Sequence, residues 1–223
     1  ISAGYRLSYP DEKLFMFYLD EFETKLFDLP EGVYTCLIEN EDCEEKILTP
    51  GMDDEIFSRT KVPMTKNEVR VLSISRLELT KKAVVYDVGS GTGSVSVECA
   101  RLSPDIAVFA IEQKEEAANL TKENAVRLGL SDQIMVINKK APEGFEELPT
   151  PTHVFIGGSS GALSDILSAI QKKLIVKENT KGVRVVINAV SLETIAQITK
   201  LIQTYPVKHV QLTQIQASRA HKL

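Results

Sequence analysis

A glycine-rich stretch at residues 85–94 is the part of this chain whose residue types and spacing most clearly suit a bound ligand. It reads Val-Tyr-Asp-Val-Gly-Ser-Gly-Thr-Gly-Ser and follows an apolar run. Glycines let the backbone turn tightly and approach a ligand closely, and the free N–H groups of a following helix attract polar groups. A dinucleotide-binding loop has the spacing G-x-G-x-x-G, whose third glycine would fall where Ser94 stands. The spacing therefore disfavours a dinucleotide.

The spacing D-x-G-x-G-x-G, which runs from Asp87 to Gly93, is instead the pattern of class I S-adenosylmethionine-dependent methyltransferases. In that pattern the acidic residue at the strand end helps to hold the loop and the amino end of the methionine. The glycines make room for the body of the ligand. We therefore predict that the cofactor is bound by Asp87, Gly89, Ser90, Gly91 and Gly93.

Glu112 ends the next apolar run, 21 residues after Gly91. A carboxylate at this point can accept hydrogen bonds from both ribose hydroxyls, and it does so in NAD sites as well as in S-adenosylmethionine sites. By itself this is a weak signal. Together with the glycine loop it predicts a nucleoside ligand and leaves the methyl acceptor open.

The acceptor side is expected after the fourth strand, where the chain reads Phe-Ile-Gly-Gly-Ser-Ser-Gly at residues 155–161. This segment has neither the N/D-P-P-Y motif of amino-group methylases nor a Pro-Cys nucleophile, so these two types of base methylation are disfavoured. Its glycines and serines supply backbone N–H groups and room for a bulky planar ligand. A plain strand-to-helix turn stays open as the alternative. Ser191 and Thr194, after the fifth strand, predict a helix cap.

Strands and helices alternate from residue 65 onward. Apolar runs predict strands at 83–88, 106–111, 134–137, 154–156 and 183–189, with a sixth at 207–216, and apolar spacing predicts helices between them. Residues 65–68 have the pattern of a capping box before a helix whose apolar face is Val69, Leu72 and Leu77, and Gly129 is placed to end the helix at 115–128. Buried strands alternating with helices predict an α/β fold with a doubly wound, mainly parallel sheet. Such sheets bind ligands at the carboxyl ends of their strands.

Composition excludes several classes of protein. The chain has 223 residues, 43% of them hydrophobic and 26% charged, with 3 cysteines, which rules out collagen, a coiled coil and a small disulfide scaffold. It has neither a membrane-spanning apolar run nor the pattern of a signal peptide at its start, so we expect a cytoplasmic protein. Cys36, Cys43 and Cys99 fit neither a redox pair nor a zinc cluster. We expect reduced thiols, with Cys99 in the core, and no metal site.

Charge divides the chain unevenly. Residues 1–56 carry 15 acidic and 4 basic side chains, a net charge of −11, whereas residues 57–223 carry 22 basic and 16 acidic side chains, a net charge of +6. A mildly basic domain is compatible with a substrate that bears several carboxylates, or with RNA. The basic excess is far weaker than that of a dedicated nucleic-acid surface, so we expect no nucleic-acid partner.

Five segments together resemble a known family, the decarboxylating precorrin methyltransferases of cobalamin synthesis (CbiT, or the carboxy-terminal half of CobL). The resemblance covers about residues 50–223 and rests on the segments 53–57, 63–70, 87–94, 155–161 and 188–194. The Gly-Gly-Ser-x-Gly turn combined with Thr-Lys-x-Glu-Val-Arg is much more specific than the glycine loop. Two positions depart from the family pattern: Lys140 stands where an acidic residue often borders adenine, and His153 starts a strand that commonly begins with Asp.

The resemblance implies methylation of precorrin-6B or its cobalt form at carbon 15, with loss of carbon dioxide from the ring C acetate and S-adenosylmethionine as cofactor. The conjugated macrocycle would itself be the nucleophile, so no catalytic residue is assigned. The resemblance adds Ala141 and Gly157 to the cofactor site. It implies a substrate site at Thr65, Lys66, Arg70, Gly158, Ser159 and Gly161. Cations suit the acetates and propionates of a precorrin. The candidates are Arg59, Lys61, Lys66 and Arg70 at the entry to the domain, and Arg219, His221 and Lys222 after the last predicted strand.

The first 40 residues resemble the closing segments of the CbiE module, an unrelated tetrapyrrole methylase fused ahead of this domain in bifunctional proteins. They predict strands at 14–19 and 32–38 and a helical turn at 22–27. We therefore expect a CbiE-like remnant with its linker at residues 1–46 and a CbiT-like domain at residues 47–223. Because the chain begins at Ile1 and ends within a strand-like run, we expect it to be a fragment. Members of the family are often tetramers, so we also expect a homo-oligomer.

Two other functions stay open. An RNA methyltransferase of the same fold would agree with the net charge of +6 and disagree with the missing base-methylation motifs. A non-catalytic partner that has kept a nucleoside pocket would bind S-adenosylmethionine without turning over a tetrapyrrole. A protein carboxyl methyltransferase shares the glycine loop, but no peptide groove is visible in the sequence.

Overall fold

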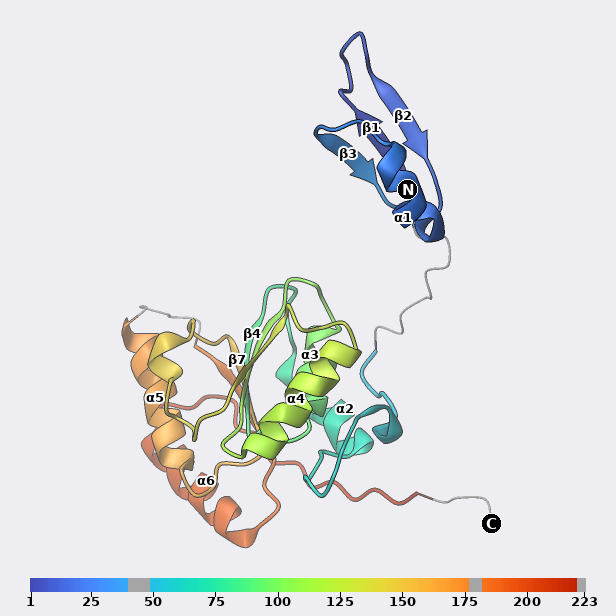
Figure 1. Ribbon diagram of the computed structural model, residues 1–223. Coiled ribbons are helices and arrows are strands. Elements are labelled where there is room, and N and C mark those ends of the chain that lie inside the picture. The colour runs from blue at the N-terminus through green and yellow to red at the C-terminus, as the bar shows by residue number, and fades with distance from the viewer. Residues whose placement is uncertain (40–48, 177–181, 220–223) are drawn as a thin grey trace. The chain divides into compact units, whose positions relative to one another are not determined.

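The chain forms two compact units, Ile1–Ile47 and Leu48–Leu223, in a computed structural model that describes residues 1–39, 49–176 and 182–219 (Figure 1). The first unit holds a three-stranded antiparallel sheet in the order β2-β1-β3. Its elements are β1 (Ser2–Tyr5), β2 (Lys13–Met16), α1 (Phe22–Lys25) and β3 (Tyr34–Leu37). The strands predicted within 14–19 and 32–38 and the helical turn predicted within 22–27 are confirmed as β2, β3 and α1. The strand β1 was not predicted.

The second unit is built on five parallel strands in the order β6-β5-β4-β7-β8. The strands are β4 (Val84–Val88), β5 (Ala107–Ile111), β6 (Ile134–Ile137), β7 (His153–Ile156) and β8 (Arg184–Ile187). The helices are α2 (Asn67–Leu77), α3 (Ser94–Ala100), α4 (Glu115–Arg127), α5 (Leu163–Val176) and α6 (Leu192–Thr204). The predicted doubly wound α/β fold is confirmed. Within the described residues, no helix has the length and apolar character needed to cross a bilayer.

Helices cover both faces of this sheet, as Figure 1 shows, with α2, α3 and α4 on one face and α5 and α6 on the other. Successive strand residues alternate between the two cores: Val85 packs toward α2 and α3, whereas Tyr86 packs toward α5. Because both side-chain directions are buried, the strands have no polar face and read as continuous apolar runs. Cys99 is buried on the first face, as expected.

The strand order reverses at β4, because the chain passes from β4 outward to β5 and β6 and then returns to β7 on the other side. In sheets of this kind a crevice forms outside the carboxyl ends of the strands at the reversal. The loop after β4 is the glycine loop, and the turn after β7 holds Gly157–Gly161. The topology therefore brings the two predicted halves of the site together.

The predicted helix is present at α2, and its buried face agrees with the predicted one only in part: Leu77 is buried as predicted, whereas Val69 and Leu72 are half-buried. Arg70, Ser73, Ile74 and Leu77 are buried, at the spacing i, i+3, i+4 and i+7. The buried face adds Ile74 and two polar residues, Arg70 and Ser73, whose types are seldom buried. The predicted capping box does not form either: the first helical N–H, that of Asn67, is bound by the carboxylate of Asp54 at 3.1 Å, which comes from an earlier segment.

Two other helix ends are as predicted. Gly129 adopts a φ of +68° after α4, and the N–H of Leu130 donates to the carbonyl of Ala125 at 2.8 Å, which is the Schellman pattern. At α6 the hydroxyl of Ser191 accepts a hydrogen bond from the N–H of Thr194 at 3.2 Å.

The predicted sixth strand is wrong. Residues 205–219 have no helix or strand, and the apolar side chains of this segment, among them Val210 and Leu212, are exposed. Alternating apolar residues form a strand only when a neighbouring strand pairs with them. No strand pairs with this segment in the part of the chain that the structure describes.

Candidate active site

The three glycines of the loop all adopt left-handed backbone conformations, with φ of +76° at Gly89, +58° at Gly91 and +75° at Gly93. Close packing adds a second requirement. A Cβ atom at Gly89 would lie 2.7 Å from the carbonyl oxygen of Gly158, and one at Gly91 would lie 2.8 Å from that of Pro63. The glycine loop is therefore in backbone contact with the turn after β7 and with the segment before α2.

Two carboxylates lie beside this loop. Asp87, in β4, is fully buried, and its Oδ2 accepts a hydrogen bond from the hydroxyl of Ser96 at 2.5 Å. Glu112 follows β5, and its two carboxylate oxygens accept hydrogen bonds from the N–H of Gly91 at 3.1 Å and of Lys114 at 2.9 Å. Burial raises the pKa of Asp87 to about 6, and the negative charge of Glu112 contributes to the rise. The loop thus lies in a negative field.

This field suits S-adenosylmethionine, which carries positive charge on its sulfonium and ammonium groups. The Oδ1 atom of Asp87 is buried and has no hydrogen-bond partner among the described residues, so an acceptor remains at the loop. The pyrophosphate of a dinucleotide would instead face two carboxylates and be repelled. Ser90 is held at the same loop by its hydroxyl, 3.1 Å from that of Thr121. The residues present therefore fit S-adenosylmethionine.

The turn after β7 forms the other side of the crevice. Gly157 and Gly158 donate backbone hydrogen bonds to the carbonyl of Val88, at 2.9 and 3.3 Å, so the turn is joined to the end of β4. A Cβ atom at Gly158 or at Gly161 would meet no other atom within 4 Å. The turn therefore has open space around these glycines, as binding a bulky ligand requires. The side chain of Gln113 donates to the hydroxyl of Ser160 at 2.7 Å and connects this turn to the end of β5.

The remaining predicted cofactor residue, Ala141, follows β6. The amide of Asn138, three residues earlier, donates to the carbonyl of Glu112 at 2.8 Å and ties the end of β6 to that of β5. Ala141 is partly buried against the core on the α5 side. The ends of β4, β5, β6 and β7 thus contribute all the predicted cofactor residues at one edge of the sheet.

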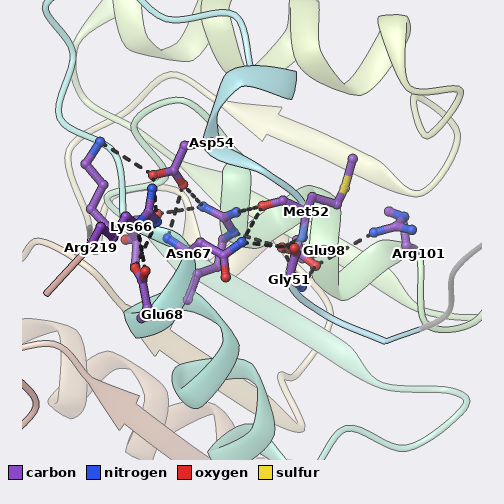
Figure 2. A network of polar contacts seen from close by, with 11 residues as sticks. Gly51, Met52, Asp54, Lys66, Asn67, Glu68, Glu98, Arg101 and Arg219 are labelled. Carbon is purple, nitrogen blue, oxygen red and sulfur yellow. Dashed lines mark hydrogen bonds and ion pairs between the residues drawn. The ribbon is translucent and has the colours of Figure 1, made fainter. Parts of the chain in front are cut away.

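Arg70 differs most from its prediction, because it is fully buried. It belongs to a network of polar contacts in which Figure 2 labels its partners Asp54, Glu98 and Met52. Its guanidinium donates to Glu98 Oε1 at 2.9 Å, to Asp54 Oδ1 at 3.1 Å and to the carbonyl of Thr65 at 2.7 Å, and it also binds the carbonyl of Met52. The guanidinium thus meets two carboxylates and two carbonyls of the protein. It lies inside the fold, where it does not meet a substrate carboxylate.

The network fastens residues 51–66, the segment that we call the entry strap. Arg70 binds the carbonyls of Met52 near its start and Thr65 near its end, and Glu98 accepts hydrogen bonds from the N–H groups of Gly51 and Met52. Burial would raise the pKa of Asp54, but the hydrogen bond and charge of Arg70 outweigh burial, and its pKa is lowered. The strap therefore crosses the glycine loop in a fixed position, with Pro63 against Gly91.

Lys66 is an exposed cation of this region, as are Arg59 and Lys61 of the strap. It is the N-cap residue of α2, its side chain is 55% exposed, and its ammonium lies 3.5 Å from Asp54 Oδ2. Arg219, which the sequence places far away, binds Glu68 at 2.6 and 2.9 Å and lies 3.3 Å from the same Asp54 oxygen. The tertiary structure thus places a second cation next to Lys66 (Figure 2).

His153, the departure at the start of β7, lies at the amino end of the sheet, away from the crevice. Its Nδ1 is 2.7 Å from the hydroxyl of Thr152, and burial lowers its pKa. It is a hydrogen-bonded structural residue. Among the described residues, no group of three or more His, Cys, Asp or Glu side chains is arranged to hold a metal ion.

Several residues that organise the site were missed in the sequence, chiefly Asp54, Glu98, Thr121 and Asn124. Glu98 carried a usable signal, because a carboxylate among the apolar residues of α3 must be paired if the helix is buried. Asn124 gave no such signal, since an amide within a helix is usually exposed. It is fully buried here.

Comparison with known proteins agrees with this geometry. The family model described as a precorrin methyltransferase domain matches residues 55–223. A probable cobalt-precorrin-6B C(15)-methyltransferase (decarboxylating) of Pyrobaculum calidifontis is 38% identical over 176 residues, which are 78% of this chain and 87% of the relative. The crystal structure of a precorrin-6y C5,15-methyltransferase from Geobacter metallireducens has a TM-score of 0.64 at 34% identity and covers 70% of this chain and 78% of its own. That of a precorrin-8W decarboxylase from Methanobacterium thermoautotrophicum has a TM-score of 0.62 at 34% identity, with coverages of 69% and 80%. The chain therefore belongs to the precorrin methyltransferase family of enzymes.

Proposed function

We propose that the chain methylates precorrin-6B or cobalt-precorrin-6B at carbon 15, removes the ring C acetate carboxyl as carbon dioxide, and uses S-adenosylmethionine as the methyl donor. The observation that carries the proposal is the pair of carboxylates, Asp87 and Glu112, beside a glycine loop that faces the open turn after β7. The names of the similar proteins support the choice of substrate.

In this proposal the cofactor lies along the ends of β4, β5 and β6. Bound S-adenosylmethionine supplies a methyl group activated by the sulfonium. The loop residues Gly89, Ser90, Gly91 and Gly93, with Asp87 behind them, contact the methionine end, and Glu112 binds the ribose. Ala141 and Gly157 border the rest of the ligand. The work of these residues is to orient the methyl group and to exclude water from it.

The substrate would occupy the side of the crevice formed by the turn after β7 and the end of the entry strap. Gly158, Ser159 and Gly161 offer backbone groups and space, and Lys66, beside Thr65, offers an exposed ammonium for a substrate carboxylate. We assign Arg70 a different task, because its guanidinium already binds two carboxylates. Arg219, another of the predicted cations, lies near Lys66, and His221 and Lys222 lie outside the described residues.

Replacing Glu112 with glutamine is expected to weaken binding of S-adenosylhomocysteine about ten- to hundredfold. The variant keeps the size of the side chain but loses the charge that strengthens a hydrogen bond to a ribose hydroxyl, a contact worth about 1.5–3 kcal/mol. Isothermal titration calorimetry measures the change. Glu115→Gln is the matched control, because Glu115 is an exposed carboxylate at the start of α4. The affinity of this variant for S-adenosylhomocysteine should stay within about twofold of wild type. Equal affinity in the two variants would contradict the assigned ribose contact.

The reaction itself is tested by incubating the chain with S-adenosylmethionine and either precorrin-6B or its cobalt form, and measuring the tetrapyrrole mass. We expect a product that has gained one methyl group and lost one carbon dioxide. Cofactor binding without a change of mass would favour a non-catalytic partner. Methylation of RNA under the same conditions would favour the RNA methyltransferase reading. A product methylated at carbon 5 would overturn the domain assignment.

We further propose that residues 1–46 are a CbiE-like remnant with its linker and that residues 47–223 are the CbiT-like domain. The support is the small amount of apolar surface that the first unit buries. In its described part, Ala3, Gly4 and Phe17 are buried, whereas Met16, Phe27 and Val33 are more than 80% exposed. So little burial does not suffice for an independent cofactor pocket. We therefore expect the chain to bind one cofactor, in its second unit.

We also propose that the chain forms a homo-oligomer, with a tetramer as the candidate form. Apolar residues near and on α6 support this: Val190 and Leu192 are exposed, and no residue of α6 is fully buried. The sheet also has an unpaired edge at β8 in the described residues. Apolar surface of this kind is commonly covered when copies of a chain associate.

A further inference from the structure

We propose that Thr121 and Asn124, both on α4, are positioning residues for the cofactor site: they set the shape of the glycine loop and hold the entry strap against it. The inference rests on the proposed function, because it assigns a role toward S-adenosylmethionine. Neither side chain needs to touch the ligand. They lie three residues apart and therefore share one face of the helix.

Asn124 joins the strap to the loop through a single amide group. Its Oδ1 accepts a hydrogen bond from the N–H of Ser58 at 2.8 Å, and its Nδ2 donates to the carbonyl of Ser58 at 3.0 Å and to that of Thr92 at 2.9 Å. Ser58 lies in the middle of the strap, and Thr92 lies between the second and third loop glycines. Because the backbone of Ser58 offers one donor and one acceptor, the orientation of the amide is determined.

Thr121 holds the loop one turn earlier on α4. Its hydroxyl donates to the carbonyl of Gly91 at 3.0 Å and lies 3.1 Å from the hydroxyl of Ser90. Its methyl group is also in close contact, since a Cβ atom at Gly93 would lie 2.7 Å from it. Together the two side chains bind the carbonyls of Gly91 and Thr92. These consecutive carbonyls are thereby turned toward α4.

This arrangement has a consequence for binding. A loop of glycines has many accessible conformations, and each must be given up when the ligand binds. If the loop is already fixed in the free protein, less conformational entropy is lost on binding, and the affinity for the ligand is higher. Other contacts from the same helix hold the strap at Thr60, through Glu116 at 2.6 Å, and at Ile56, through Arg127. Helix α4 therefore sets the distance between strap and loop.

The test uses the full chain, with S-adenosylhomocysteine as the calorimetric probe and hydrogen exchange as the readout for the strap. Asn124→Ala should weaken binding about tenfold or more and speed exchange at residues 56–63, because it removes the three hydrogen bonds to the strap and the loop, together with one from Arg127 at 3.1 Å. Thr121→Val keeps the shape of the side chain without its hydroxyl and should weaken binding about fivefold. Thr121→Ser keeps the hydroxyl and should stay within about twofold of wild type.

Gln133→Ala is the matched control for Asn124→Ala. The Gln133 amide donates to three carbonyls, of Ala100, Ser103 and Ile106, at 2.8–3.1 Å, but at the amino end of the sheet. Gln133→Ala should lower thermal stability about as much as Asn124→Ala does, and it should leave the affinity for S-adenosylhomocysteine unchanged. In turnover, the positioning variants should raise KM for S-adenosylmethionine more than they lower kcat.

The outcomes separate the inference from the function on which it rests. A wild-type chain that does not bind S-adenosylhomocysteine would overturn the proposed function. If the wild type binds, and Asn124→Ala and Thr121→Val bind equally well, the positioning role is wrong. Equal weakening in Gln133→Ala would also overturn it, because the effect would then follow stability alone. If Asn124→Ala does not fold, the comparison of Thr121→Val with Thr121→Ser decides.

Discussion

Replacing Arg70 with methionine is expected to lower the free energy of unfolding by about 3–5 kcal/mol, the usual cost of removing one partner from a buried ion pair. The variant would leave the carboxylates of Asp54 and Glu98, both buried, without their shared cation. It would also release the carbonyls of Met52 and Thr65 and the contact of the guanidinium with the ring of Phe57, 4.8 Å away. Chemical denaturation measures the loss.

Arg76→Met is the control, because Arg76 lies on the same helix and is exposed, and its effect should stay within about 0.5 kcal/mol. A second comparison separates charge from packing. Adding Glu98→Gln to Arg70→Met should restore part of the lost stability, since one uncompensated charge is removed. A loss below about 1 kcal/mol for Arg70→Met would contradict the structural role assigned to this residue.

Replacing Asp87 with asparagine is expected to change how stability depends on pH. Burial raises the pKa of Asp87 from 3.8 to about 6 in the folded chain. The folded state therefore binds the proton more tightly than the unfolded state, and wild-type stability falls as pH rises from 3.8 to about 6. The asparagine variant has no such titration. Relative to wild type it should gain about 3 kcal/mol across this window.

Denaturation of both proteins from about pH 4 to about pH 8 measures this difference. Ser96→Ala is a useful companion variant, because its hydroxyl donates to Asp87 and lowers the pKa of the carboxyl. Removing it should steepen the loss of stability with pH. Parallel pH profiles for Asp87→Asn and wild type would mean that Asp87 is not a buried acid with a raised pKa. If the carboxylate costs stability near neutral pH, its retention beside the glycine loop agrees with binding a cationic ligand.

Much of the fold could be predicted because its rules are local. Apolar runs between periodic helices indicate strands covered on both faces, and this pattern was enough for β4 through β8. The glycine loop could also be predicted from the sequence, since only glycine takes a φ such as the +76° of Gly89 without strain. Because strand ends of a parallel sheet meet at one edge, the sequence order of Asp87, Glu112 and Gly157 already predicted their common site.

The strand at residues 207–216 could not be decided in this way. Alternation of apolar and polar residues describes what a strand would bury, but the hydrogen bonds of a strand require a partner. The pattern is present and the partner is absent among the described residues. Whether such a segment pairs depends on what lies beside it in space.

The chain's sequence by itself determined the class of fold, the glycine loop and the carboxylate at the end of the next strand, because each depends on residue type and short spacing. Only the tertiary structure decided what Arg70 binds, because its positive charge suits a substrate carboxylate as well as it suits a buried carboxylate of the protein. Its partners, Asp54 and Glu98, are 16 and 28 residues away along the chain. Asn124 and Ser58, which are hydrogen-bonded to each other, are 66 residues apart. A charged group or an amide can be buried when the fold places a hydrogen-bonding partner beside it. The residues adjacent in the sequence do not indicate which residue that partner is.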